Sequence, residues 1–220
     1  MKRTLFTLVL FLASIVMMAQ VVSEDTRQKF GINVAVFNDF WMDVPDGLDA
    51  RFMNQGSNVG FQYNHRLGKS HLFLTIGGGL GMHNLYSNGE ILDIKADTIS
   101  FTNITRDYKK SKLSLTYLDI PFEFTYKSKK GFRMAAGFKA GYLISSHTKY
   151  KGDLSNTDGT LVKYKNIGVK QIEPWRYGPT FRVGYRWINV WAYYQLSTVF
   201  REDRGPEFYP ISVGIMILPW

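Results

Sequence analysis

The 220-residue chain contains no cysteine. This absence excludes disulfide bonds, thiolate metal sites, cysteine nucleophiles and a lipidated N-terminal cysteine. Beyond its first two dozen residues, the chain also lacks any apolar run long enough to cross a membrane as a helix. If the protein enters a membrane, its mature part must therefore do so with another kind of structure.

Acidic residues are in the minority, with 18 Asp and Glu against 27 Lys and Arg and a formal net charge of +9. The basic residues are scattered rather than gathered in a stripe, and no nucleic-acid-binding module is recognisable, so we expect no nucleic-acid partner. Asp43, Asp46 and Asp49 lack the spacing and the closing Glu of a calcium loop. We expect no metal and no cofactor.

The N-terminus has the pattern of an export signal. Residues 1–3 are positively charged, and residues 5–16 form an apolar segment that is too short for a spanning helix. Ala19-Gln20 is a plausible cleavage point. We predict a signal peptide over 1–19, a polar lead-in over 20–29 and a single domain over 30–220. An uncleaved membrane anchor is the alternative.

Aromatic residues make up 15% of the chain, and apolar and polar residues alternate along it. In Leu118–Tyr126 the even positions are apolar, whereas the odd positions include Asp119 and Glu123. Successive side chains of a strand point to opposite faces, so this is a strand with one apolar face. We expect eight such strands, over residues 30–40, 58–67, 72–81, 118–126, 132–142, 176–186, 190–198 and 209–217.

The connections between these strands alternate between long loops and tight turns. The turns lie near residues 68–70, 127–131 and 187–189, and the long loops include 41–55 and 145–170. Long loops at one end and short turns at the other are typical of outer-membrane barrels, in which an even number of strands leaves no unpaired edge. We therefore predict an all-β protein: an eight-stranded, antiparallel, up-and-down transmembrane barrel.

The polar face of the strands distinguishes a membrane barrel from a soluble one. In a small soluble barrel the inward face is the apolar face. In this chain small residues and charged residues share one face, which fits a narrow lumen filled by a few long side chains that form ion pairs, for example Glu123 with Arg133. Alternation alone leaves a lipocalin-like soluble barrel open. The predicted lumen charge network consists of Arg66, Asp119, Glu123, Arg133, Lys139, Arg182 and Arg186.

Aromatic residues cluster near both ends of the predicted strands. Two aromatic belts are expected where a membrane barrel crosses the two interfaces. The residues predicted to form these belts are Trp41, Tyr126, Tyr142, Trp175, Tyr185, Trp187 and Trp220.

The motif Tyr-Leu-Asp-Ile-Pro-Phe at residues 117–122 resembles a strand motif of the PorT-like outer-membrane β-barrel family of Bacteroidetes-type bacteria. The resemblance implies an eight-stranded barrel in the bacterial outer membrane and, for one member, an association with protein secretion. Trp220 supplies the terminal aromatic residue expected for recognition by the barrel-assembly machinery, although it is out of phase with the preceding strand.

Two irregularities are expected around this motif. Leu113, Leu115 and Tyr117 are apolar at odd positions, where the strand below carries charge. Either a bulge near 117–118 or a strand that continues above the membrane would account for this change. Pro121 cannot donate a hydrogen bond to a neighbouring strand, so a local irregularity is expected there as well.

An eight-stranded barrel is only wide enough for side chains to fill it. The function we expect is structural, in interaction or assembly, and not enzymatic. A narrow channel for small solutes is one alternative. A loop-borne enzyme is another, with His83, Ser87 and Asp93 or Asp97 as its candidate residues. The other partners that we expect are membrane lipid and lipopolysaccharide, whose phosphates Lys149, Lys151, Lys163, Lys165 and Lys170 could meet unless that loop is merely solvated.

Overall fold

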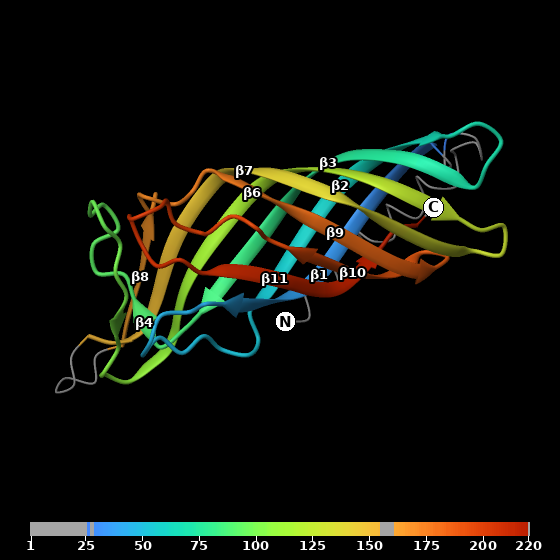
Figure 1. The fold of residues 1–220 in the computed structure, drawn as a ribbon. Coiled ribbons are helices and arrows are strands. Elements are labelled where there is room, and N and C mark those ends of the chain that lie inside the picture. The colour runs from blue at the N-terminus through green and yellow to red at the C-terminus, as the bar shows by residue number, and fades with distance from the viewer. Residues whose placement is uncertain (1–25, 27–28, 155–160, 220) are drawn as a thin grey trace.

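The computed structural model describes residue 26, residues 29–154 and residues 161–219. Eight antiparallel strands form a closed ring in which β1 pairs with both β2 and β11 (Figure 1). This confirms the predicted eight-stranded barrel. The ring consists of β1 (Phe30–Met42), β2 (Gln55–Arg66), β3 (Leu72–Tyr86), β6 (Tyr108–Lys127), β7 (Phe132–Asp153), β9 (Trp175–Tyr185), β10 (Ile188–Tyr194) and β11 (Tyr209–Ile217).

Three further strands lie outside the ring: β4 (Gly89–Glu90), β5 (Thr102–Asn103) and β8 (Leu161–Ile167). No described helix is long and apolar enough to cross a membrane. The predicted signal peptide over 1–19, and the predicted lead-in except Thr26 and Lys29, lie outside the described residues.

All four long loops leave the same end of the barrel, which we call the outer end, and the tight turns lie at the opposite, turn end. The turns β2–β3, β6–β7 and β9–β10 each contain a residue with a left-handed backbone, namely Gly68, Gly131 and Arg186. In outer-membrane barrels of this architecture the turns are periplasmic and the long loops extracellular. The alternation of loops and turns therefore orients the molecule.

The two faces of each strand differ as the sequence predicted. On β6, Ile120 and Phe124 are 53% and 58% exposed on the outside, whereas Asp119 and Glu123 are 1% and 5% exposed inside. The outer surface thus carries a broad band of exposed apolar side chains. Such a surface is stable against lipid and not against water, so the apolar face is the lipid-facing one.

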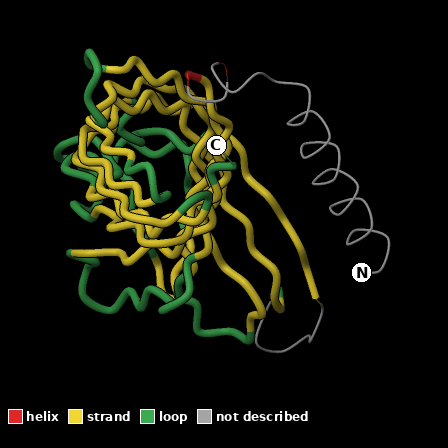
Figure 2. The backbone as a smooth tube through the Cα atoms, turned by 90° about the vertical axis from the view of Figure 1, so that its right-hand side faces the viewer, coloured by secondary structure: helices red, strands yellow, loops and turns green. Residues whose placement is uncertain are grey.

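Strands β6 and β7 extend well past the ring at the outer end. Pairing of β7 with β9 ends at Tyr142–Trp175, beyond which β7 pairs with β8 instead. We call this region the outer extension: residues 108–116 of β6, 145–153 of β7 and all of β8. The prediction of a loop over 145–170 was wrong for residues 145–153 and 161–167, which are strand. A strand with lysine on one face and tyrosine on the other is too polar to resemble a membrane strand. Figure 2 shows strands that extend beyond the ring on one side.

Both expected irregularities are present near the 117–122 motif. From Ser111 to Thr125 the odd positions of β6 face inward, so β6 continues above the membrane and its inward face changes from apolar to charged. A register shift between Thr116 and Tyr117 is taken up on β7, where Tyr117 pairs with Leu143 and Thr116 with Ser145. Opposite Pro121, the β3–β6 pairing is interrupted between Ile76–Phe122 and Gly79–Asp119.

Candidate functional site: a charged lumen beneath an apolar cap

The lumen nearest the turn end is held by Glu123 on β6 and Arg182 on β9. Nε of Arg182 donates to Oε2 of Glu123 at 2.9 Å, and the Thr180 hydroxyl donates to Oε1 at 3.0 Å. Thr125 receives a further hydrogen bond from Nη2 of Arg182. Both charged side chains are buried, so each depends on the other for the electrostatic interaction that water would otherwise supply.

A second layer, closer to the outer end, is centred on Asp119. The Arg176 guanidinium approaches both carboxylate oxygens, with Nη2 at 2.7 Å from Oδ2 and Nε at 3.1 Å from Oδ1. Nζ of Lys139 lies 3.2 Å from Oδ2. This two-point contact between a guanidinium and a carboxylate fixes the geometry as well as the charge.

His83 connects Arg176 to the far wall of the lumen. Its Nε2 lies 2.6 Å from Nη1 of Arg176 and its Nδ1 lies 2.9 Å from Oδ2 of Asp39. Because a guanidinium can only donate, Nε2 must be the acceptor, and the ring proton is then on Nδ1, which donates to Asp39. The other oxygen of Asp39 accepts a hydrogen bond from Ser212 at 2.6 Å. His83 is therefore a neutral bridge within the lumen.

Aromatic rings cover the cations of this layer. Nζ of Lys139 lies 3.6 Å from the centre of the Tyr193 ring, and the guanidinium of Arg176 lies 4.0 Å from that of Tyr117. Trp191 stacks beside Tyr193. These cation–π contacts stabilise charge where water is excluded. Tyr117, the first residue of the motif that carries the family resemblance, thus helps to close the lumen.

The described charges deep in the lumen balance. Three carboxylates, on Asp39, Asp119 and Glu123, are accompanied by three cations, on Lys139, Arg176 and Arg182. A cavity of about 30 Å³ between the two layers is lined by Asp119, Glu123 and Lys139, among others. A cavity of that size has room for one or two water molecules, since one needs about 10–15 Å³ by this measure. Ion-paired polar side chains therefore pack closely in this part of the interior.

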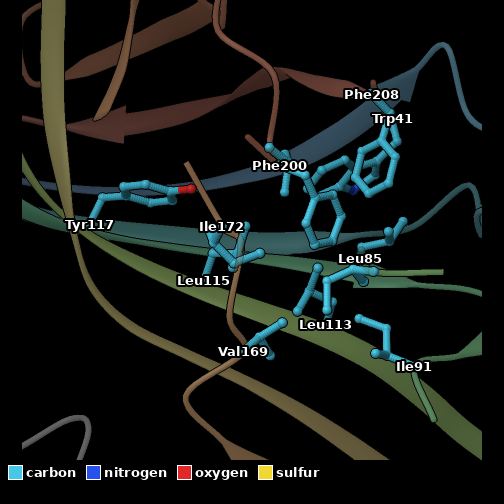
Figure 3. Packing of buried hydrophobic residues seen from close by; sticks show 12 residues of the cluster. Trp41, Leu85, Ile91, Leu113, Leu115, Tyr117, Val169, Ile172, Phe200 and Phe208 are labelled. Carbon is cyan, nitrogen blue, oxygen red and sulfur yellow. The ribbon is translucent and has the colours of Figure 1, made fainter. Parts of the chain in front are cut away.

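An apolar cluster closes the lumen at the outer end (Figure 3). Three loops contribute to it: Ile91 and Ile99 come from the β3–β6 loop, Val169 and Ile172 from the β7–β9 loop, and Phe200 from the β10–β11 loop. Barrel strands add inward residues, among them Trp41, which packs edge-on against Phe208 with ring centres 5.3 Å apart. We call this cluster the apolar cap; it consists of Trp41, Leu85, Ile91, Ile99, Leu113, Leu115, Tyr117, Val169, Ile172, Val199, Phe200 and Phe208.

The structure brings together Asp119, Glu123, Lys139 and Arg182 of the predicted network but not the other members. Arg66 and Arg186 are exposed at the tight turns, where Arg66 donates to the carbonyl of Ser70 and Arg186 lies over the Tyr185 ring. The predicted Glu123–Arg133 pair is also wrong. Glu123 is opposite Gly137 on β7, whereas Arg133 is half-buried opposite Lys127, near the turn end.

Sequence reasoning missed several residues of the site. Asp39, His83 and Ser212 each lie on an inward-facing position, yet their mutual contacts depend on how the barrel closes between β1 and β11. Arg176 begins the strand predicted over 176–186 and shares the face of Arg182, but the predicted network did not include it. Only the register across the ring shows which inward residues meet.

The predicted interface aromatics divide in a similar way. The structure places Tyr126, Tyr142, Trp175, Tyr185 and Trp187 on the outside, 36% to 57% exposed. For Trp41 the prediction was wrong: β1 runs to Met42, and Trp41 is at an inward position, where it packs in the apolar cap. Trp220 lies outside the described residues.

The residues considered for a loop-borne enzyme do not meet. His83 is buried between Asp39 and Arg176, while the Ser87 hydroxyl contacts Gly89, Asp93 contacts the backbone of Lys95, and Asp97 pairs with Lys170. A nucleophile and its base must lie within hydrogen-bond reach of each other. Among the described residues there is also no group of three or more His, Asp or Glu side chains placed to hold a metal ion.

Comparison with known proteins agrees with this architecture. A family model described as the outer membrane protein beta-barrel domain matches residues 18–201, a range that includes seven of the eight strands of the ring. No curated protein matches the chain. The family match, the closed ring and the apolar outer surface lead to one conclusion: the chain belongs to the outer-membrane protein β-barrel domain family and is located in the bacterial outer membrane.

Proposed function

We propose that this barrel acts as a structural and interaction protein of the outer membrane and does not conduct solutes. The observation that carries the proposal is the filled interior: two ion-paired layers occupy the lumen, and the apolar cap lies above them. Moving a solute through would require breaking buried ion pairs. Leaving one charge of such a pair without its partner costs about 3–5 kcal/mol.

The contact surface for a partner would then lie on the outer loops or the turns. Among the large apolar side chains on the described outer loops, the most exposed are Phe52, at 79%, and Leu92, at 70%. Exposed apolar side chains on loops that a rigid barrel positions are typical of interaction sites. A role as an accessory of a secretion system is the more specific proposal, supported by the PorT-like motif at 117–122 alone.

That motif supports a shared architecture more directly than a shared partner. Tyr117 and Asp119 both contact Arg176 in the lumen, and Leu118 faces outward. A relative that has the same motif would need the same lumen packing, whichever protein it contacts. The identity of the partner must therefore come from an experiment on the intact membrane.

Planar-bilayer recording tests the closed lumen. We expect the folded, heat-modifiable protein to give no stable conductance steps under conditions in which an open porin gives regular ones. Replacement of Phe200 and Phe208 by Ala, which thins the apolar cap, should still give none, because the ion-paired layers below remain. Reproducible ohmic steps from the wild-type protein would contradict the proposal and favour a narrow channel.

Photo-crosslinking in native membranes tests the interaction role. A crosslinking amino acid at position 92 should capture a defined protein partner. The same amino acid at position 120, which faces lipid, is the matched control and should capture none. Equal protein capture at both positions, or capture at neither of positions 52 and 92, would count against a loop-borne contact.

A further inference from the structure

Six lysines form a regular grid on the outward face of the outer extension. The strand registers place them in two rows across β6, β7 and β8, with each lysine directly opposite another. The rows are Lys112–Lys149–Lys165 and Lys110–Lys151–Lys163. Side chains directly opposite on neighbouring strands lie about 5 Å apart at Cβ, and successive rows on one face lie about 7 Å apart along the strands.

This arrangement is unfavourable for the extension by itself. Like charges directly opposite each other on neighbouring strands are destabilising. None of the six lysines forms an ion pair with a described carboxylate. Burial, together with the charges of Lys110, Lys149 and Lys165, lowers the pKa of Lys112 to about 8. The pKa of Lys149, which lies at the centre of the grid, is lowered by its lysine neighbours, Lys163 first among them.

The opposite face of the extension has no such excess of charge. Tyr150 of β7 stacks on Tyr164 of β8, with ring centres 5.0 Å apart. The Glu90 carboxylate accepts hydrogen bonds from Arg106 and from the Tyr164 hydroxyl. Packing of this inner face against the β3–β6 loop therefore explains why the extension folds. It does not explain why the outward face carries lysine at every position of the grid.

The grid lies just above the apolar band of the barrel. Tyr142 and Trp175, whose rings are in contact, are 46% and 57% exposed where the β7–β9 pairing ends. Ile144 and Ile167 continue this band and are 52% and 67% exposed. Exposed aromatic residues at this end mark the interface between lipid and headgroups. Lys149 follows His147, the partner of Ile167, by two residues, so the grid begins at headgroup height.

We propose that the lysine grid binds the phosphate groups of lipopolysaccharide, the glycolipid of the outer leaflet. The grid is continuous with the lipid-facing surface, and an anionic lipid surface attracts lysines placed close to it. Lysine binds phosphate as a flexible point charge, so six ammonium groups at this spacing suit a headgroup with several phosphates. Nζ of Lys110 and Nζ of Lys112 lie 5.0 and 5.5 Å from the centre of the Tyr86 ring. These two contacts hold the β6 lysines of the grid in place.

The test is a binding titration of the folded barrel in nanodiscs with phosphorylated and with dephosphorylated lipopolysaccharide. The variant is Lys149→Gln, Lys163→Gln and Lys165→Gln combined. The matched control removes three exposed lysines at the turn end: Lys69→Gln, Lys129→Gln and Lys130→Gln. Each lysine near an anionic surface contributes on the order of a fivefold change in affinity. We expect the grid variant to bind the phosphorylated form about 10- to 100-fold more weakly, and the control to bind it as the wild type does.

Stability distinguishes a binding role from a structural one. Without lipopolysaccharide, the grid variant should unfold at the same temperature as the wild type or at a higher one, because it has lost only repulsion. The proposal is overturned if the grid variant binds phosphorylated lipopolysaccharide as tightly as the control. It is also overturned if the wild type does not prefer the phosphorylated form, or if inorganic phosphate or phosphatidylglycerol vesicles compete equally well, since the grid would then be a general anion surface.

Discussion

At the scale of single residues, burial decides how much an arginine contributes to the stability of the barrel. Arg176 is 1% exposed and contacts Asp119, His83 and the Tyr117 ring. Arg186 has the same side chain but is exposed at a turn. The sequence places both near strand ends on the polar face. Their different surroundings lead to opposite expectations for stability.

Replacing Arg176 by Met should strongly destabilise the barrel, because Asp119 would keep only Lys139 as its ionic partner. Removing one member of a buried ion pair costs about 3–5 kcal/mol, and the remaining lysine favours the lower end of that range. The control, Arg186→Met, should change the free energy of unfolding by no more than about 0.5 kcal/mol. Urea unfolding in lipid vesicles, followed by tryptophan fluorescence, measures both. Equal effects of the two substitutions would show that the lumen layer contributes little.

The same residues show how much of the site can be predicted. Alternation predicts which side chains face inward, because a strand has a period of two, and it placed Asp119, Glu123, Lys139 and Arg182 correctly. It does not predict pairing, which depends on the stagger of strands around a closed ring. Glu123 therefore meets Arg182 of β9, two strands away, and not Arg133 of the adjacent strand.

At the scale of elements, the outer extension differs most from expectation. Its lysines are separated mostly by serine, threonine and tyrosine, a composition that resembles a solvated loop when lipid-facing strands are sought. Periodicity was nevertheless present: Lys149 and Lys151 alternate with Thr148 and Tyr150, and Lys163 and Lys165 flank Tyr164. Bilayer thickness limits the length of a strand only inside the membrane. The sequence therefore did not predict how far these strands extend beyond it.

Lys112 gives the extension a dependence on pH. Its pKa in the folded protein is about 8, below the ordinary lysine value of 10.5, so the unfolded chain binds more protons between these values. Stability must then rise with pH in that window. We expect amide hydrogen exchange of β6 and β7 in the extension, corrected for intrinsic rates, to slow from about pH 8 to about pH 10 relative to a Lys112→Met variant. An identical pH profile in the two proteins would refute this.

At the scale of the whole molecule, the order of long loops and tight turns determines the orientation in the membrane. Because the chain has no cysteine, single engineered thiols report on it without background. We expect Leu92→Cys to react with a membrane-impermeant maleimide in intact cells. Lys129→Cys, at a turn, should react only after the outer membrane is opened. Labelling of Lys129→Cys in intact cells would reverse the orientation, and with it the placement of the lysine grid at the outer leaflet.

The hydrogen bond between Ser212 and Asp39 joins residues that are 173 positions apart in the chain. It can form only when β11 meets β1, the last step that closes the ring when the strands are added in chain order. Contacts of such long range are slow to form, and once formed they must break before the seam can open. Inside the lumen, hydrogen bonds continue from Asp39 to His83 and Arg176, and they stabilise the seam between the first and last strands. The lifetime of the folded barrel should accordingly be governed by a slow unfolding rate as well as by its equilibrium stability.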